Sequence, residues 1–458
     1  MAQIHIAMYP WLAMGHLTSF LHLSNKLAER NHKISFFIPA RTQHKLTHFN
    51  LHPHLITFIP ITVPNIPGLP EHTETTADVP YPLHSLLMAA MDKTAPEIDG
   101  LIEKLKPHVV FFDFTHWLPA LARRFGVKSV HYCIISPAAF GFFTRPEVKA
   151  EGRRLTVEEI MQPPPGFPPS CIKLKKFEAK GLVREIEKEY GEGVQFTDRL
   201  LTSVSDSDAI GFKTCQEIEG SYADYVGKLI NKPVLMAGPV IPETPNSNLD
   251  EKWVNWLGQF GPNTVIYCAF GSECTLPKTQ FQELILGFEL TGMPFLAALK
   301  LPFGCETIES ALPDGFEERV AGRGLMCGDW VPQQLMLAHR AIGCFVTHCG
   351  YGSLTEALVN ECQLVLLPNV GDQIINARMM GEDLRVGVEV EKGDESGLFD
   401  RDGVCRAVKA VMDGESEIGK VVRANHTKWR EFLLRNELER DYVDSFVNKL
   451  RNILTSKR

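Results

Sequence analysis

Short apolar runs alternate with amphipathic stretches along most of this chain, and this alternation limits the folds open to it. The runs that predict buried strands in the first part are residues 4–9, 33–40, 109–113 and 129–135, and the stretches with helical spacing are residues 17–30 and 117–125. Strands that alternate with helices pack into a parallel sheet covered on both faces. The sequence therefore predicts an α/β fold.

A polar, proline-rich stretch divides the chain into two such units. Residues 240–248, VIPETPNSN, interrupt the alternation and are predicted to be a linker. The pattern then restarts, with strand-like runs at residues 264–272, 294–300, 325–330, 343–350, 364–369 and 386–391. We expect a first domain at residues 1–239 and a second at residues 249–439, each a doubly wound, Rossmann-like unit.

The last segment, residues 440–458, has apolar residues at helical spacing. These residues are Val443, Phe446, Val447, Leu450 and Leu454. The spacing predicts an amphipathic helix that closes the structure by burying one face. Residues 147–192 are instead charged and proline-rich, and we interpret them as a mobile loop or insertion.

Composition excludes several kinds of partner. The formal net charge is -8 and, apart from KLKK at residues 173–176, Lys and Arg form no cluster, so neither nucleic acid nor an anionic membrane is expected as a partner. The 11 cysteines lack CxxC and Cys/His ligand spacings, which favours reduced thiols over a disulfide framework or zinc. No apolar run approaches the roughly 20 residues that span a bilayer, and the start lacks a basic signal-peptide region. We expect a cytoplasmic chain without stable membrane insertion.

Residues 330–373 contain groups suited to a nucleotide. The indole of Trp330, beside Val331, offers a flat face for a base. Gln333 and Glu356 can form hydrogen bonds with ribose hydroxyls. This stretch therefore predicts a nucleoside site in the second domain.

The middle of the same stretch predicts a phosphate site. A strand-like run leads to His348, and the sequence then enters a helical pattern, which places Gly350, Gly352 and Ser353 at a helix N-terminus. The unpaired N–H groups and the positive dipole end there favour phosphate oxygens, and the imidazole adds a donor. Taken alone, Ser353 is better explained as an N-cap, and it is the neighbouring residues that favour a phosphate site.

Carboxylates in two places have different interpretations. Asp372 and Gln373 follow the strand at residues 364–369, where open α/β sheets hold their ligands, and they can bind sugar hydroxyls. Asp206-Ser207-Asp208 has the letters of a metal-binding DxD motif, but it precedes a strand-like run and is expected to form a surface turn. No metal site is predicted.

A histidine and an aspartate in the first domain are candidates for proton transfer. His16 lies between the first predicted strand and the first predicted helix, where an imidazole can project into a cleft as a general base. A loop histidine is more often merely solvated. Asp113, however, ends the strand at residues 109–113 in the same predicted sheet, and a carboxylate bonded to one ring nitrogen fixes the tautomer and stabilises the cation.

These motifs together resemble one family. The stretch from Trp330 to Gln373 resembles the signature segment of plant secondary-product UDP-sugar glycosyltransferases, and GHLTSFLHLS near the start, the aspartate of VVFFDFTHW and the FGS that ends in Ser272 extend the resemblance over nearly the whole chain. The resemblance implies the GT-B fold, in which an acceptor-binding domain and a UDP-sugar-binding domain face a cleft and the C-terminal helix packs back on the first domain.

The resemblance also implies a mechanism. His16 would be the base and Asp113 its partner, while Ser272, His348 and Ser353 would stabilise the departing diphosphate. Sugar transfer would proceed with inversion, without a metal and without a cofactor, since the UDP-sugar is a co-substrate. The chain is expected to act as a monomer.

One departure narrows the expected substrates. The family segment usually has HCGWNS where this chain has HCGYGS, so Tyr351 changes the wall expected near the donor sugar, and Gly352 supplies no side-chain amide. This variant, together with PPPGFPPS at residues 163–170, resembles the branch-forming subgroup that adds a second sugar to a glycoside. The resemblance therefore implies transfer from UDP-rhamnose or UDP-glucose to a sugar hydroxyl of a flavonoid 3-O-glucoside.

Several alternatives remain open from the sequence. Trp11, Phe114 and Phe140 are candidates for an acceptor pocket, although each is also explained by ordinary packing. A phenolic or terpenoid aglycone is an alternative acceptor for UDP-glucose. A nicotinamide-dependent dehydrogenase is disfavoured because Thr355 stands where the third glycine of GxGxxG belongs, and a non-catalytic UDP-sugar binder would not need the His–Asp pair.

Overall fold

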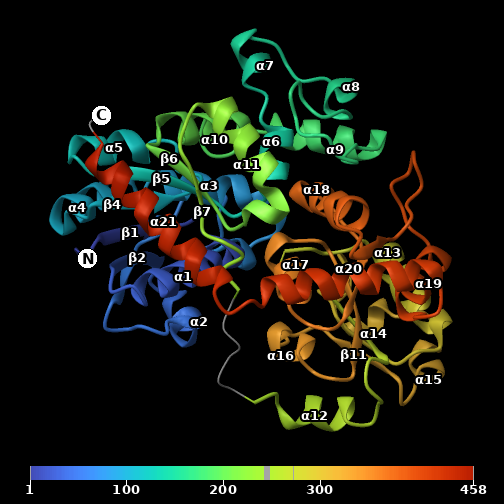
Figure 1. The fold of residues 1–458 in the computed structure, drawn as a ribbon. Coiled ribbons are helices and arrows are strands. Elements are labelled where there is room, and N and C mark those ends of the chain that lie inside the picture. The colour runs from blue at the N-terminus through green and yellow to red at the C-terminus, as the bar shows by residue number, and fades with distance from the viewer. Residues whose placement is uncertain (1, 242–247, 272, 457–458) are drawn as a thin grey trace.

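The computed structural model describes residues 2–241, 248–271 and 273–456, and in these ranges the chain forms two parallel sheets flanked by helices (Figure 1). The first sheet and its helices are named the first lobe, and the second sheet and its helices the second lobe. The prediction of an α/β fold with two doubly wound units is confirmed. Most of the predicted linker, residues 242–247, lies outside the described residues.

The first sheet has the strand order β3-β2-β1-β4-β5-β6-β7. Its strands are β1 (His5–Tyr9), β2 (Lys33–Pro39), β3 (Ile56–Ile61), β4 (Val109–Phe112), β5 (Lys128–Cys133), β6 (Ala209–Phe212) and β7 (Val234–Met236). The order changes direction between β1 and β4, which pair in parallel with Tyr9 opposite Phe112. Such a switch point opens a crevice at the carboxyl ends of the two strands. The sequence prediction did not include β3 and β7.

Helices cover both faces of the first sheet. They are α1 (Met14–Ala28), α2 (Gln43–Leu46), α3 (His84–Asp92), α4 (Ala95–Leu105), α5 (Leu118–Arg124), α6 (Pro137–Phe143), α7 (Pro146–Ala150), α8 (Val157–Ile160), α9 (Lys176–Ile186), α10 (Phe196–Asp206) and α11 (Gln216–Ile230), with 3₁₀ turns η1 (Thr47–Phe49), η2 (Thr76–Asp78) and η3 (Tyr81–Leu83). Alternate residues of a strand face opposite sides. In β1, Ile6 and Met8 therefore pack in the core with α1, while Ala7 and Tyr9 pack on the other face with α3 and α4.

The second sheet repeats this plan with the order β10-β9-β8-β11-β12-β13. Its strands are β8 (Val265–Ala269), β9 (Phe295–Ala298), β10 (Gly324–Cys327), β11 (Ile342–Thr347), β12 (Gln363–Leu366) and β13 (Gly387–Glu389). Its helices are α12 (Glu251–Leu257), α13 (Lys278–Thr291), α14 (Ile308–Ala311), α15 (Phe316–Arg319), α16 (Gln333–Leu337), α17 (Tyr351–Leu358), α18 (Asp372–Arg378), the π-helical turn η4 (Met379–Asp383), α19 (Arg401–Met412) and α20 (Glu417–Leu433). Here the switch point lies between β8 and β11, so the loops after these strands border the second crevice.

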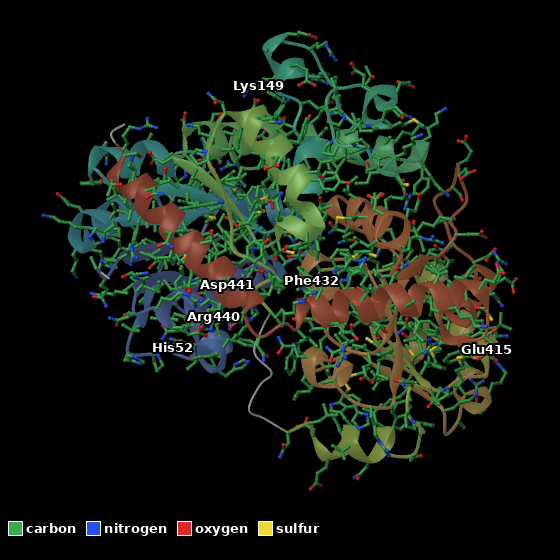
Figure 2. All side chains as sticks on the ribbon, viewed as in Figure 1. His52, Lys149, Glu415, Phe432, Arg440 and Asp441 are labelled. Carbon is green, nitrogen blue, oxygen red and sulfur yellow. The ribbon has the colours of Figure 1, made fainter. Side chains whose placement is uncertain are left out.

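The C-terminal helix α21 (Leu438–Thr455) returns from the second lobe to the first. Figure 2 shows the crossing between Phe432, near the end of α20, and Asp441, near the start of α21. The buried face of α21 consists of Val443, Phe446, Val447, Leu450 and Ile453. The Phe446 ring lies 6.0 Å from that of Phe111 in β4, so the chain end is anchored in the core of the first lobe.

Residues 147–192 do not form the mobile loop that their composition suggested. They contain most of α7 together with α8 and α9, and they contact the second lobe. Glu178 of α9 forms an ion pair with Arg378 of α18, with 2.8 Å between carboxylate oxygen and guanidinium nitrogen and both side chains almost fully buried. The charged composition therefore reflects inter-lobe contacts as well as solvation. None of the helices within the described ranges combines the length and apolarity that a bilayer crossing needs.

Candidate functional site

His16 and Asp113 lie together at the switch point of the first sheet. The helix α1 begins at Met14, so His16 occupies its first turn and not the preceding loop, as the sequence had suggested. Its Nδ1 is 2.5 Å from Oδ2 of Asp113. Asp113 is 3% exposed, and its other oxygen accepts hydrogen bonds from the backbone N–H groups of Trp11 at 2.7 Å and Phe114 at 2.8 Å. Because the carboxylate is fixed, the pair favours the tautomer with a proton on Nδ1, which leaves Nε2 as a proton acceptor.

The aromatic residues expected at the acceptor pocket occupy different environments. Phe114 is half-buried, and its ring lies 5.7 Å from that of His16. Trp11 is almost fully buried and packs its ring against Phe114 and Tyr190. The placement of Phe140 at the pocket is wrong, because this residue has 0% exposure and packs against Phe212 in the core. Its position in the sequence gave no indication that α6 turns this side chain inward.

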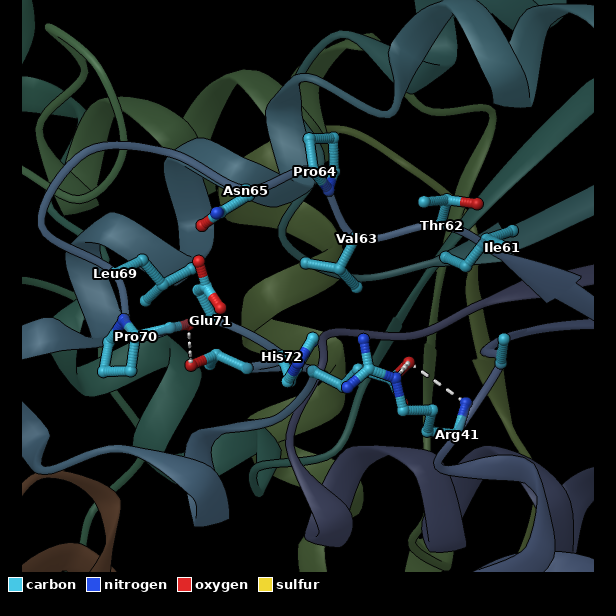
Figure 3. Close-up of a pocket in the computed structure, with 13 residues that line it drawn as sticks. Arg41, Ile61, Thr62, Val63, Pro64, Asn65, Leu69, Pro70, Glu71 and His72 are labelled. Carbon is cyan, nitrogen blue, oxygen red and sulfur yellow. Dashed lines mark hydrogen bonds and ion pairs between the residues drawn. The ribbon is translucent and has the colours of Figure 1, made fainter.

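A cavity of about 390 Å³ lies at the carboxyl ends of β2 and β3 (Figure 3). Its lining combines polar side chains, among them Arg41, Glu71 and His72, with apolar ones such as Val63 and Leu69. β2 is the immediate neighbour of β1 in the sheet, and adjacent strands are about 5 Å apart. The cavity therefore borders the same edge of the sheet as the His16–Asp113 pair.

The turn between β11 and α17 brings His348 close to the N-terminus of a helix. Gly350 is the N-cap of α17, and Gly352 and Ser353 lie in its first turn. Desolvation of the half-buried His348 lowers its pKa to about 4 and keeps the imidazole neutral near pH 7. Within the described residues, Nδ1 of His348 has no hydrogen-bond partner. The helix N-terminus and a neutral imidazole thus supply donors without a fixed positive charge.

The residues predicted for the nucleoside surround α16. Trp330 is 78% exposed, so most of its indole is free to stack on a planar group, and Val331 behind it is buried. The side-chain amide of Gln333 donates to Oγ of Ser353 at 3.1 Å and to Oε2 of Glu356 at 2.7 Å. These polar groups therefore converge beside the N-terminus of α17.

Asp372 and Gln373 begin helix α18, after β12. Burial raises the pKa of Asp372 to about 6, and its hydrogen bond with Asn376 acts in the opposite direction. In this hydrogen bond Asp372 accepts from the side-chain amide of Asn376 at 3.1 Å. The side-chain oxygen of Gln373 accepts from the backbone N–H groups of Asn369 and Val370, so its NH₂ group remains for a ligand. Asp372 of the second lobe interacts electrostatically with His16 of the first, which indicates that the two predicted sites lie near each other.

Two features singled out in the sequence add little to the description of the site. Ser272 lies outside the described residues. In the Asp206-Ser207-Asp208 sequence, Asp208 accepts from the backbone N–H of Ser129 and pairs with Lys128 at 3.2 Å, so it stabilises the start of β6. Among residues 2–241, 248–271 and 273–456, no group of three or more His, Cys, Asp or Glu side chains is arranged to hold a metal ion.

Tyr351, the residue expected to change the wall near the donor sugar, also contacts the other lobe. Its hydroxyl points to the first lobe and donates to Oε2 of Glu219 at 2.6 Å. Sequence reasoning missed Glu219 because it lies in a segment with ordinary helical spacing, and its burial depends on the other lobe. Asn376 was also missed, although its position four residues after Asp372 places both on one face of a helix.

The chain is similar in sequence to known proteins. Residues 241–427 match the family model described as UDP-glucoronosyl and UDP-glucosyl transferase. The chain is 59% identical to a cyanidin 3-O-galactoside 2''-O-xylosyltransferase of Actinidia chinensis var. chinensis over 98% of each chain. It is 56% identical to an anthocyanidin 3-O-glucoside 2''-O-glucosyltransferase of Ipomoea nil, again over 98% of each chain.

Solved structures share the fold. A UDP-glucosyltransferase from Polygonum tinctorium superimposes with a TM-score of 0.81 at 21% identity, covering 100% of this chain and 99% of the other. A Phytolacca americana UGT2 complexed with UDP-2fluoro-glucose and pterostilbene gives a TM-score of 0.78 at 24% identity, covering 99% and 100%.

Proposed function

This chain belongs to the UDP-glucoronosyl and UDP-glucosyl transferase family, and from this we propose that it transfers a sugar from a UDP-sugar to a sugar hydroxyl of a flavonoid glycoside. It has the GT-B fold expected from the sequence, and it is a UDP-dependent glycosyltransferase. The observation that carries the proposed chemistry is the fixed His16–Asp113 pair, with Asp372 of the second lobe within electrostatic reach of His16.

In the proposed mechanism, His16 removes the proton from the acceptor hydroxyl. Nε2 accepts this proton while Nδ1 donates to Asp113, and the buried carboxylate stabilises the imidazolium that forms. The half-buried Phe114 ring beside His16 offers an apolar surface for a phenolic ring. The alkoxide character that develops on the acceptor oxygen then makes it able to attack the anomeric carbon.

The second lobe is proposed to hold the donor and to stabilise the leaving group. Trp330 stacks on uracil, Gln333 and Glu356 bind the ribose, and Asp372 with Gln373 binds sugar hydroxyls. Negative charge on the departing diphosphate is stabilised by the N-terminus of α17 and by neutral His348. We propose that these donors suffice without a metal, and that attack from the face opposite UDP inverts the anomeric configuration.

The proposed acceptor is a flavonoid 3-O-glycoside, in line with the acceptors named for the relatives at 59% and 56% identity. Those names also specify a xylosyl and a glucosyl transfer. We therefore propose UDP-glucose as the donor, with UDP-xylose and UDP-rhamnose as the alternatives. We further propose that the chain acts as a monomer in the cytoplasm.

The test is to incubate the protein with each of these three UDP-sugars and either a flavonoid 3-O-glucoside or its aglycone. The expected result is one added sugar, detected by product mass, on the glucoside and none on the aglycone. Transfer to the aglycone alone would contradict the proposed acceptor, and absence of transfer with every pair would contradict the proposed function.

The base assignment has its own test. His16→Ala should lower turnover about 10²- to 10⁴-fold, the usual contribution of a general base, while UDP affinity stays unchanged. His44→Ala, an exposed histidine of the same lobe, is the matched control and should retain wild-type turnover. Normal turnover in the His16 variant would remove the assignment.

A further inference from the structure

Glu219 is a carboxylate without exposed surface at the contact between the lobes. It lies in α11, where its backbone departs from helical geometry with φ -133° and ψ 17°. Oε2 accepts from Oγ1 of Thr214 at 2.7 Å and from the hydroxyl of Tyr351 at 2.6 Å, while Oε1 accepts from the backbone N–H of Ala138 at 3.4 Å. Burial raises its pKa, and these hydrogen bonds act in the opposite direction. A buried carboxylate depends on such partners, and here one partner belongs to the other lobe.

Tyr351, the partner of Glu219 in the second lobe, lies where it can fix the position of helix α17 relative to the first lobe. Tyr351 is the first residue of α17, directly after the N-cap Gly350. The hydrogen bond to Glu219 therefore ties the helix end that faces the diphosphate to the segment that follows β6. The same segment contains the buried ammonium of Lys213, which interacts electrostatically with Glu356 of α17.

A second polar connection runs parallel to the first. Ser136, the N-cap of α6, donates to Oδ1 of Asn376 at 3.0 Å, and both residues are fully buried. The amide of Asn376 in turn donates to the backbone carbonyl of Cys349 and to Asp372, each at 3.1 Å. The residues that follow β5 and β6 in the first lobe thus contact two parts of the second lobe. One is the turn between β11 and α17, proposed to bind the diphosphate, and the other is helix α18, proposed to bind the sugar.

We propose that Glu219 is a positioning residue that, through the Tyr351 hydroxyl, holds α17 and the bound UDP-sugar in register with His16. This inference rests on the proposed function of the site. The base belongs to one lobe and the reactive carbon to the other, so a small rotation between lobes separates them, and a misplacement of about 1 Å can lower a rate about 10²-fold. UDP contacts only the second lobe in this scheme, so its affinity does not depend on the bond.

The primary test is Tyr351→Phe, which removes one hydroxyl and keeps the ring. Turnover should fall about 10- to 100-fold through misalignment, by the same factor with each UDP-sugar, while the Kd for UDP measured by calorimetry stays within about twofold. The matched control is Tyr442→Phe. Its hydroxyl donates to Glu217 of the same helix α11 at 2.7 Å. Because this hydrogen bond does not involve the second lobe, turnover should stay at the wild-type level.

Two results of this test would overturn the proposal. Wild-type turnover in Tyr351→Phe would show that the hydrogen bond does not position the donor. Losses of turnover that differ between UDP-sugars, together with weaker UDP binding, would instead indicate that Tyr351 forms a wall of the sugar site. Either result can be obtained while the wild-type protein transfers sugar normally, so the proposed function would stand.

Glu219→Gln completes a double-mutant cycle with Tyr351→Phe. If the two groups act through one hydrogen bond, turnover of the double variant should be no lower than that of the less active single variant. A loss of turnover equal to the product of the two single losses would contradict the coupling. Hydrogen exchange of residues 351–358 and 214–220 provides a readout that needs no substrate. Faster exchange in both segments of Tyr351→Phe is expected, and unchanged exchange would oppose the proposal even if no active substrate pair were found.

Discussion

At the scale of single residues, the site depends on how burial and neighbours set the state of each titratable group. Asp113 is buried but accepts two backbone N–H groups and the His16 ring, so its carboxylate is fixed in place. Desolvation of the half-buried His348 lowers its pKa to about 4, which keeps its imidazole neutral. In the proposed mechanism, histidine thus serves as a proton acceptor in one lobe and as a neutral donor in the other.

Asp113→Asn should lower turnover about 10²- to 10⁴-fold, because an amide neither selects the Nδ1–H tautomer nor stabilises the imidazolium. UDP affinity should stay unchanged, since Asp113 lies in the first lobe. Steady-state kinetics and calorimetric titration with UDP measure the two effects. Asp99→Asn makes the same chemical change at an exposed position of α4 and should have no effect. Equal activity of the two variants would argue against the proposed role of Asp113.

The raised pKa of Asp372 predicts that the stability of the protein depends on pH. Burial raises its pKa from 3.8 to about 6, so between these values the folded protein binds more protons than the unfolded chain. Stability therefore falls as pH rises through this window, and the cost is fully present above pH about 6. Asp372→Asn removes the titrating group. The difference in Tm, variant minus wild type, should be more positive at pH 8 than at pH 4.5 in thermal melts. A pH-independent difference would mean that Asp372 does not titrate in this range.

At the scale of elements, the turn between β11 and α17 is shaped by its glycines. A Cβ at Gly350 would lie 2.7 Å from Nε2 of His348, and one at Gly271 would lie 3.2 Å from the same ring. The imidazole is therefore held between two positions that exclude side chains. At Gly352, by contrast, a Cβ would meet no atom within 4 Å. The lack of a side chain at Gly352 is therefore not required by packing, unlike that at Gly350.

This difference gives a matched pair of substitutions. Gly350→Ala should displace His348 and weaken UDP binding at least about tenfold, because charge-assisted hydrogen bonds to the diphosphate are each worth about 1.5–3 kcal/mol. Gly352→Ala should keep UDP affinity and stabilise the helix by about 0.5–1 kcal/mol through reduced backbone entropy of the unfolded chain. Calorimetry and thermal melts measure both. Equal affinities for UDP would show that the His348 position is unimportant.

At the scale of the whole molecule, polar contacts of which one is buried join the lobes. The buried Arg378 pairs with Glu178 of α9 across the lobes and with Glu389 of β13 within the second lobe. The hydroxyl of Thr76 donates to Glu273, and that of Tyr351 donates to Glu219. Helix α21 adds an apolar connection through Phe446. Burial removes most screening by salt from such pairs. The cleft geometry is therefore set by directional contacts as well as by apolar packing.

Glu178→Ala should lower the free energy of unfolding by about 2 kcal/mol, because Arg378 stays buried with one carboxylate in place of two. Urea denaturation measures the change, which should persist in high salt. Glu391→Ala breaks the Arg406–Glu391 pair, whose side chains are 62% and 80% exposed, and should change stability by no more than about 0.5 kcal/mol. Similar effects of the two substitutions would show that the inter-lobe pair does not stabilise the fold.

The sequence determined the features that depend on neighbours along the chain. Strand and helix periodicity predicted the two doubly wound units, and the HCG segment predicted a helix N-terminus after β11. These features follow from local geometry, which repeats every two residues in a strand and every 3.6 in a helix. His16 and Asp113 were identified for a related reason, since parallel strands bring the residues after their carboxyl ends to one edge.

Only the tertiary structure decided which side chains meet across the lobes. It buried Phe140 in the core, joined the Tyr351 hydroxyl to Glu219, and packed α9 on Arg378. Each of these outcomes depends on a partner that is distant in the chain, and the spacing of polar and apolar residues does not specify which distant surfaces come together. The sequence therefore determines the two halves and their ligand-binding edges, while the contacts between the halves, which set the distance from base to donor, arise only when both have folded against each other.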